Sequence, residues 1–189
     1  MKNLFHNKKL DDLDDKEEIN LFNKYINYYN TIYYFISIGI ERNLRKKIKN
    51  YILLFQASKD GYESNYFHLK CDGKNNTVTF IKTKTGRIFG GFTDASWDKY
   101  INYKKGSSDF IFSLDNREIY YNKNSNHNIW CSEKVGPTFG KNDFTILSDG
   151  KEGRDNSRNS YETYDKKYAL AGDREFLIDD YEVYQLELE

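Results

Sequence analysis

The stretch Thr77-Val-Thr-Phe-Ile-Lys-Thr-Lys-Thr-Gly-Arg-Ile-Phe-Gly-Gly-Phe-Thr93 contains two strand patterns separated by a short turn. Residues 77–83 alternate polar and apolar side chains, Thr85-Gly86 supplies the turn, and residues 87–93 return as a second strand. Glycines at 90 and 91, inside a strand, indicate a bulge or the close approach of another segment. This stretch predicts an antiparallel hairpin in a β-rich domain.

Further strands are predicted on the C-terminal side of this hairpin. Their residues are 109–114, 118–121, 128–131, 143–147 and 181–188. Short strands joined by Gly and Asn turns favour a sandwich or barrel over a parallel α/β sheet. The almost wholly polar residues 149–160 predict a mobile surface loop.

Apolar side chains at helical spacing predict helices on the N-terminal side. A first helix over about 15–29 carries Ile19, Phe22, Tyr25, Ile26 and Tyr29, and we expect it to pack on the domain because this stripe is too apolar to remain in water. Residues 33–40 fit either a strand or a helix. A second helix is predicted from Leu44 to Phe55, with Arg and Lys on its other face, and Gly61 is expected to stop it.

Composition excludes several classes of protein. The 29 basic and 29 acidic residues cancel, so we expect no nucleic-acid partner. The 17 Tyr, 13 Phe and 2 Trp provide enough apolar surface for a core. Residues 1–9 lack an apolar stretch of signal-peptide length, and the longest apolar run, 31–40, is too short to span a bilayer. These features predict a cytoplasmic protein without a transmembrane segment.

No motif in the chain points to catalysis. Phosphate-binding loops, dinucleotide-binding loops and metalloprotease or hydrolase signatures are absent from the sequence. Cys71 and Cys131 form no C-x-x-C pair and are expected to be reduced thiols. His68 and Cys71 are spaced for one helix face, which fits a packed pair better than a zinc site that lacks other ligands. We therefore predict no catalytic residue, metal or cofactor.

Six segments, in order from residue 53 to residue 186, together resemble the TLDc domain family, the module shared by oxidation-resistance proteins. They are 53–62 with its Ser-Lys-Asp60-Gly61 turn, 67–74, 88–93 followed by Trp97, 110–114, 136–140 followed by Asp143, and 178–184. Each segment is short, but the ordered set is specific.

The resemblance implies an α+β fold, a two-sheet antiparallel β-sandwich with flanking N-terminal helices. Residues 41–189 would form the TLDc domain and residues 1–40 an N-terminal helical extension. It also implies a non-enzymatic interaction module with a role in oxidative-stress protection, in regulation of the vacuolar-type proton pump, or in both. Subunits of the vacuolar-type ATPase are the implied protein partner.

The residues singled out as family motif or candidate interface are Asp60, Gly61, Gly90, Gly91, Trp97, Tyr100, Tyr103, Gly136, Pro137, Phe139, Gly140 and Glu182. Trp97 and Phe139 are interpreted as core anchors, and Pro137 as a turn residue. Tyr100 and Tyr103 have polar neighbours and are expected to face outward. Glu182 falls on an apolar strand face, so it should accept hydrogen bonds from backbone or Tyr hydroxyl groups.

Two other functions stay open from the sequence. The first is a small redox or hydrolytic enzyme that uses Cys71 or Cys131, which would need an exposed thiol of lowered pKa. The second is a structural partner of a helical protein, bound through the N-terminal amphipathic helices.

Overall fold

The computed structural model describes residues 34, 36–42, 44–123, 126–164 and 166–189. Residues 36–42 are helical, which decides for a helix in the described part of the run 33–40. The remaining elements are β1 (Ile48–Gln56), α2 (Ala57–Asp60), α3 (Ser64–Cys71), β2 (Thr77–Thr83), β3 (Ile88–Thr93), β4 (Asn102–Lys104), β5 (Phe110–Ser113), β6 (Glu118–Tyr121), β7 (Ile129–Cys131), β8 (Thr138–Phe139), β9 (Phe144–Ile146), β10 (Glu152–Asp155) and β11 (Glu175–Leu188).

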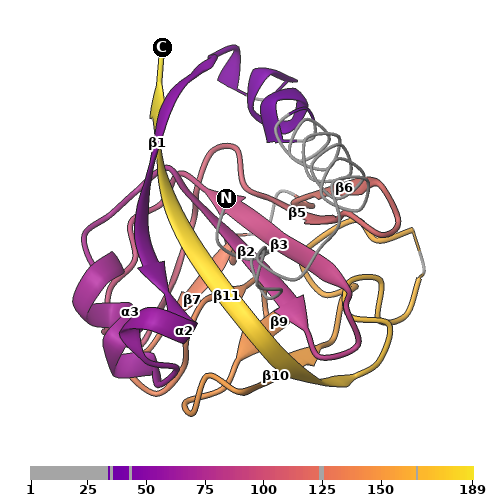
Figure 1. Cartoon of the computed structure of the whole chain (residues 1–189). Helices are drawn as coiled ribbons and strands as arrows, with labels where there is room; N and C mark the ends of the chain where they lie inside the picture. The colour runs from indigo at the N-terminus through magenta and orange to yellow at the C-terminus, as the bar shows by residue number, and fades with distance from the viewer. Residues whose placement is uncertain (1–33, 35, 43, 124–125, 165) are drawn as a thin grey trace, which may run out of the picture.

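Two antiparallel sheets share the long strand β11 (Figure 1). The first sheet has the order β1-β11-β2-β3-β5-β6, and the second has the order β11-β10-β9-β8-β7-β4. β11 pairs with β10 through residues 175–177, and with β2 and β1 through later residues. The structure therefore confirms the predicted α+β fold with a two-sheet antiparallel sandwich.

Each face of the first sheet has its own apolar core. The core between the sheets includes Phe55, Phe67, Phe89, Trp97, Phe139, Phe144 and Tyr181, all buried. The second core lies on the opposite face of the first sheet and includes Phe80, Phe92, Phe110, Phe112 and Tyr184. Ile36 and Ile40, from the helical residues 36–42, are buried in this second core, and the boundary that the sequence suggested at 40/41 falls inside that helix.

The predicted hairpin is β2 and β3, which lie inside the first sheet. Thr77 pairs with Thr93 and Lys82 with Ile88, and Gly86 turns the chain with a φ of 87°. Its two adjacent glycines face opposite cores. A Cβ on Gly90 would collide with the backbone oxygen of Thr79 and the ring of Phe112, and a Cβ on Gly91 would lie 2.6 Å from the Phe139 ring. The close approach inferred from the glycines is confirmed.

The predicted helix from Leu44 to Phe55 is wrong. Residues 48–56 form β1, which pairs antiparallel with β11 from Ile48↔Leu188 to Gln56↔Glu182. Between residues 45 and 61, only Ala57–Asp60 is helical, and Gly61, with a φ of 108°, follows as the expected stop. The apolar spacing of residues 44–55 fits the period of a helix and that of a strand. The strand forms because its pairing with β11 gives hydrogen-bond partners to the backbone N–H and C=O groups of both segments.

The predicted mobile loop at residues 149–160 is also wrong. Residues 152–155 form β10 between β9 and β11. Beyond it, the buried Asp143 accepts hydrogen bonds from the backbone N–H groups of residues 158–161. A carboxylate that accepts several N–H groups fixes a turn that has few apolar side chains of its own, so a polar composition does not make this segment loose.

The other predicted strands are present, and three further features were not predicted. β4 and β8 are two or three residues long, too short for a periodic pattern, and β11 begins at Glu175 rather than at Tyr181. The predicted first helix, about 15–29, lies outside the described residues. Within the described part, no helix is long and apolar enough to cross a membrane.

Gly91→Val should destabilise the domain by about 1–3 kcal/mol, the usual cost of overpacking a core. The new side chain would press on the Phe139 ring across the sandwich. Urea denaturation measures the loss. Phe139→Ala makes space at this point, so the same Val substitution should cost less in that background. Equal costs in the two backgrounds, or a wild-type melting temperature for Gly91→Val, would contradict the packing argument.

Candidate interaction surface

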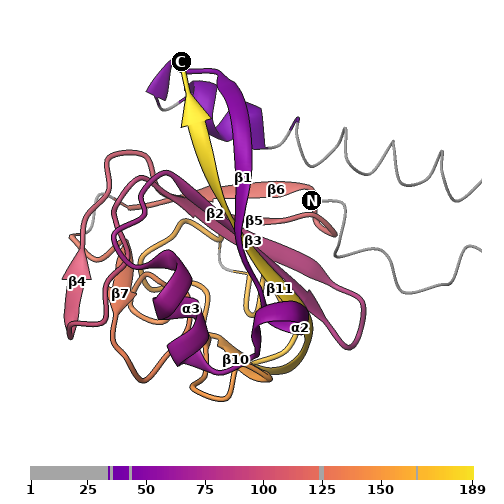
Figure 2. The same cartoon turned by 60° about the vertical axis from the view of Figure 1, so that its left-hand side comes forward.

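The segment between β3 and β5 carries the most exposed apolar side chains near the second sheet's outer strand, β4. Tyr100 and Ile101 are 69% and 71% exposed, and Tyr103 is 40% exposed. β4 ends the sheet and pairs only with β7 (Figure 2). The Lys104 carbonyl accepts a hydrogen bond from the Asn128 N–H, so the backbone of Lys104 faces β7. Successive residues of a strand face opposite sides, so the N–H and C=O groups of Tyr103 face away from the sheet.

The exposed segment stands on a rigid base. The Trp97 side chain is buried, its Nε1 donates to Thr77 Oγ1 at 2.8 Å, and its ring lies edge-on to Phe67 and Phe139. Lys104 Nζ lies 2.6 Å from Asp98 Oδ2, and Asp98 Oδ1 accepts the Tyr100 N–H. Core packing at one end and an ion pair in the middle therefore fix where Tyr100 and Ile101 project.

Tyr103 is part of an aromatic ladder on the outer strands. Its ring centroid lies 4.5 Å from that of Trp130 and 4.4 Å from that of His127. Tyr103 and Trp130 are direct cross-strand partners on β4 and β7, a pairing that stabilises sheet edges. Half of the Tyr103 side chain is thus engaged in the fold, and the remainder is presented outward.

A groove next to this segment is lined by Asn65, His68, Leu69, Asp72, Lys99, Glu133 and Lys134. Lys99, the neighbour of Tyr100, forms part of one wall, and its carbonyl accepts the Glu133 N–H. Leu69 on α3 forms part of the other wall and is 78% exposed, the highest value among the exposed large hydrophobic side chains. Figure 2 shows α3 on the same side of the molecule as β4 and β7.

The groove wall is held by His68. Its Nδ1 lies 2.8 Å from Asp72 Oδ1, and its Nε2 lies 2.9 Å from the carbonyl oxygen of Ser132. Both ring nitrogens therefore have acceptors, and the imidazole ties α3 to the turn after β7. This is the packed role that the sequence favoured for His68 over a zinc site.

Together, Leu69, Tyr100, Ile101 and Tyr103 form what we call the apolar rim, an exposed apolar group interrupted by the polar groove. Apolar and aromatic anchors surrounded by charged side chains are the composition of protein-binding surfaces. Lys99, Glu133 and Lys134 supply the charged surround.

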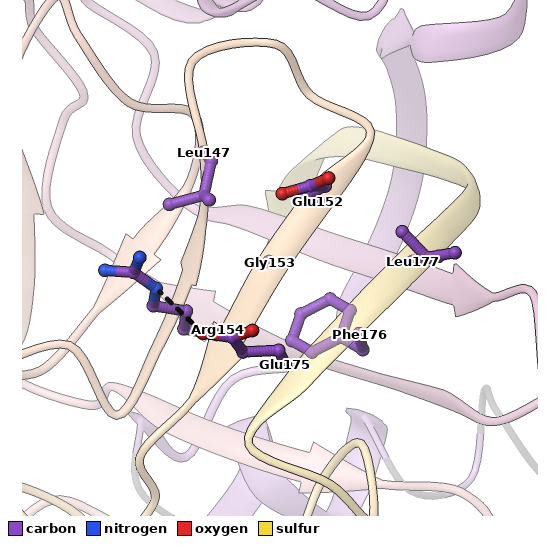
Figure 3. Close-up of a pocket in the computed structure, with 7 residues that line it drawn as sticks. All are labelled: Leu147, Glu152, Gly153, Arg154, Glu175, Phe176 and Leu177. Carbon is purple, nitrogen blue, oxygen red and sulfur yellow. Dashed lines mark ion pairs between the residues drawn. The ribbon is translucent and has the colours of Figure 1, made fainter.

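A second cleft lies at the opposite end of the second sheet, between β10 and the start of β11 (Figure 3). Its lining residues are Leu147, Glu152, Gly153, Arg154, Glu175, Phe176 and Leu177. Arg154 Nε lies 3.9 Å from Glu175 Oε1, and both side chains are exposed. Phe176 packs against Gly153, where a Cβ would collide with its ring. Arg154 compensates the charge of Glu175 and leaves Glu152 as the charge of the lining without an ion pair to a described residue.

Most residues of the predicted motif set lie in the core or in turns. Gly90, Gly91, Trp97 and Phe139 pack at the two faces of β3, as described above. Gly136 donates its N–H to Ile146 O, the Pro137 carbonyl accepts the Ile146 N–H, and Gly140 turns the chain after β8 with a φ of 67°.

Asp60 and Gly61 end α2. Asp60 Oδ2 accepts the backbone N–H of Gln56, and Oδ1 lies 3.3 Å from Lys70 Nζ. A side chain on Gly61 would meet the Tyr66 ring. Of the twelve predicted residues, only Tyr100 and Tyr103 reach the apolar rim, and the structure does not gather the others around it.

Glu182 lies on the buried face of β11 that carries Tyr184 and Leu186. The Tyr184 hydroxyl donates to Glu182 Oε2 at 2.6 Å, the kind of hydrogen bond that its apolar surroundings predicted. Burial, together with the nearby charge of Asp180, raises the pKa of Glu182 to about 7. Removal of this carboxylate from water explains the direction of the shift.

Both thiols are buried and unpaired. Burial raises the pKa of Cys71 above its ordinary range, and burial raises the pKa of Cys131 to about 11. Within the described ranges, no group of three or more His, Cys, Asp or Glu side chains is placed to hold a metal ion.

Leu69 and Ile101 were missed as candidate surface residues. Leu69 follows Phe67 and His68 on α3, and Phe67, His68 and Cys71 are buried. The spacing of those three residues marks the inner face of the helix and leaves Leu69 on the outer face, a signal that was available in the sequence. Ile101 stands between two tyrosines and gave no such signal.

Glu182→Gln should increase stability at neutral and alkaline pH. The native carboxyl holds its proton up to a pKa of about 7, against an ordinary value of 4.5. The unfolded state loses that proton first, so wild-type stability falls as pH rises from about 4.5 to about 7, by up to about 3 kcal/mol. Urea denaturation at pH 5 and pH 8 should show that the free energy of unfolding of the variant, relative to that of wild type, is higher at pH 8 than at pH 5. Glu187→Gln, exposed on the same strand, is the control. A constant difference would refute the assignment.

The chain was compared with protein families and with curated proteins. The family model described as the TLDc domain matches residues 23–187, nearly the whole chain, and it begins within the segment 1–40 that was assigned to an extension. A search of curated proteins found no match. The matched length begins before β1 and ends one residue before the end of β11, and the chain belongs to the TLDc domain family.

Proposed function

We propose that this TLDc domain is a non-enzymatic interaction module that binds a protein partner through the apolar rim. The supporting observation is that Leu69, Tyr100 and Ile101 are each at least 69% exposed, although the segments that carry them are held firmly by the core. A preordered apolar surface loses little entropy on binding, so burying it contributes more to affinity. Scattered exposed apolar residues need no explanation, but a group that flanks one groove does.

The family resemblance supplies the finer part of the proposal. The partner would be the vacuolar-type proton pump, and the role would be its regulation, protection against oxidative stress, or both. A cytoplasmic location is consistent with two free cysteines, because thiols remain reduced there.

Two features support the non-enzymatic part. Each thiol is buried and has a raised pKa, the reverse of what a nucleophilic cysteine needs. The two clefts also differ from a catalytic pocket, because their lining consists mostly of exposed charged and apolar side chains rather than of a buried nucleophile and its base.

The variant Leu69→Asp/Tyr100→Ala/Ile101→Ala should weaken binding to the solubilised vacuolar-type pump by about tenfold or more, because truncated anchors carry most of an interface's energy. Surface plasmon resonance with the immobilised domain measures the affinity. All three side chains are exposed, so the melting temperature should stay close to that of wild type.

Leu177→Asp is the matched control, because Leu177 is 58% exposed at the other end of the molecule, beside β10. It should bind like wild type. If wild type fails to bind the pump, the partner is wrong. If the triple variant binds as tightly as wild type, the apolar rim is not the binding site.

Both cysteines should react slowly with a disulfide reagent in the native state. At pH 7, a pKa of about 11 for Cys131 leaves roughly one thiol in ten thousand ionised, and burial limits access further. After unfolding in guanidinium, both cysteines should react with the reagent as fast as the thiol of glutathione does. A native thiol that reacts as fast as glutathione or faster would favour the thiol-enzyme alternative.

A further inference from the structure

Residues 95–108 carry Tyr100, Ile101 and Tyr103 of the apolar rim, and an aspartate lies at each end of this segment. We call the place where the two ends meet the base of the segment. Asp94 directly follows β3, Asp109 directly precedes β5, and Tyr100, Ile101 and Tyr103 lie between them. The Asp94 N–H donates to Asp109 Oδ1 at 3.1 Å, and the Ser107 N–H donates to Asp94 Oδ1 at 2.8 Å. Each carboxylate thus holds the backbone on the opposite side of the base.

The two carboxylates also face one another across Gly106. A Cβ on Gly106 would collide with Asp109 Oδ1 and with Asp94 Oδ1, so both oxygens border the same small space. Asn128 completes the base, because its Nδ2 donates to Gly106 O and its backbone N–H donates to Lys104 O, both at 3.0 Å.

Two buried acceptor atoms of this base lack a hydrogen-bond donor among the described residues. Asp109 is 3% exposed, and its Oδ2 makes no hydrogen bond to any described residue. The buried Asn128 Oδ1 likewise receives no hydrogen bond from the described part of the chain. A proton on one carboxyl would add the missing donor and remove one of two like charges.

In the described part of the chain, neither Asp94 nor Asp109 forms an ion pair with a basic side chain. The groups that face Asp109 are the Asp94 carboxylate, the hydroxyls of Thr93 and Tyr161, and the Asn128 amide. The Tyr161 hydroxyl is already committed to Asn128 O, and Lys104 in the same segment pairs with Asp98. Burial, and then the charge of Asp94, raises the pKa of Asp109 to about 7.

We propose that Asp94 and Asp109 together hold one proton, and that loss of this proton loosens the segment 95–108 and so regulates the apolar rim. The inference rests on the proposed function for its consequence, but the proton and the loosening are properties of the domain alone. With the proton bound, one carboxyl and one carboxylate hold both sides of the base. Without it, two like charges, the buried Asp109 and the half-buried Asp94, repel each other across Gly106.

The direction with pH follows from the native state holding the extra proton. Below the native Asp109 pKa of about 7, the pair keeps its proton and the two ends of the segment stay together. Above this pKa both carboxylates are charged and repel each other. The amides of the segment should therefore lose protection as pH rises through neutrality, and the rim should bind its partner more tightly at pH 6 than at pH 8.

Carbon-13 NMR of the aspartate carboxyls, in the presence of EDTA, tests the proton directly. One aspartate should titrate with a midpoint about three pH units above the ordinary value near 3.8. That signal should be absent in Asp109→Asn. In Asp94→Asn its midpoint should fall, because the neighbouring charge is gone. Asp173→Asn, at an exposed position, should leave it unchanged. If every aspartate titrates near its ordinary value, the proposal is overturned.

Hydrogen exchange tests the loosening. After correction for intrinsic rates, protection of residues 95–108 should fall by about tenfold from pH 6 to pH 8, following the ionised fraction of the carboxyl. The β9–β10 region should not change, and Asp109→Asn should abolish the effect. If that variant does not fold, Asp94→Asn should move the loss of protection to lower pH, because burial still raises the pKa of Asp109 after the neighbouring charge is removed. Unchanged protection in wild type would overturn the switch even if the proton is found. Neither measurement uses the pump, so failure of the proposed function is recognised separately.

Discussion

The architecture depends on β11, which is the only strand of the described chain that belongs to both sheets. Its first residues pair with β10, and its later ones pair with β1 and β2. A register irregularity between Ile178 and Asp180 lies where the strand leaves one sheet for the other. Irregularities of this kind bend a strand and increase its twist.

Asp180 connects the bend of β11 to the end of β1 and the start of α2 through hydrogen bonds. Its carboxylate accepts the Ser58 N–H at 3.0 Å, the Ser58 hydroxyl at 2.6 Å and the Gln56 amide at 2.9 Å. The end of β1 and the start of α2 are thereby attached to β11 at the bend. Residues more than 120 positions apart along the chain are linked at this point, so the two sheets should form and unfold as one cooperative unit.

The sequence predicted the elements whose determinants are local. β2 and β3 have a strand period on both sides of a turn, and the signal lies within seventeen residues. β1 failed because its apolar spacing suits a helix as well, and its partner is at the other end of the chain. β10 failed because its four residues, Glu152–Asp155, include no apolar side chain. The ordered turn after it failed because Asp143, which holds that turn, is 15 or more residues away. Contacts of this range leave no periodic mark.

The same distinction applies to the candidate surface. Tyr100 and Tyr103 were found because aromatic side chains stood among polar neighbours, whereas Leu69 joins them only through the packing of α3 beside the second sheet. Gly90, Gly91, Trp97 and Phe139 are all packed in the interior of the sandwich, where they support the fold. Motifs of this kind identify a fold and leave its binding surface to more variable positions.

The second core has a practical consequence for any shortened form of this protein. Aromatic side chains of β2, β5 and β11 form one face of the first sheet, and Ile36 and Ile40 are buried against that face. An expression product that started at residue 41 would discard those two side chains and leave part of an aromatic sheet open to water. Such surfaces associate with one another, so the product would tend to aggregate, and its self-association could be mistaken for natural oligomerisation.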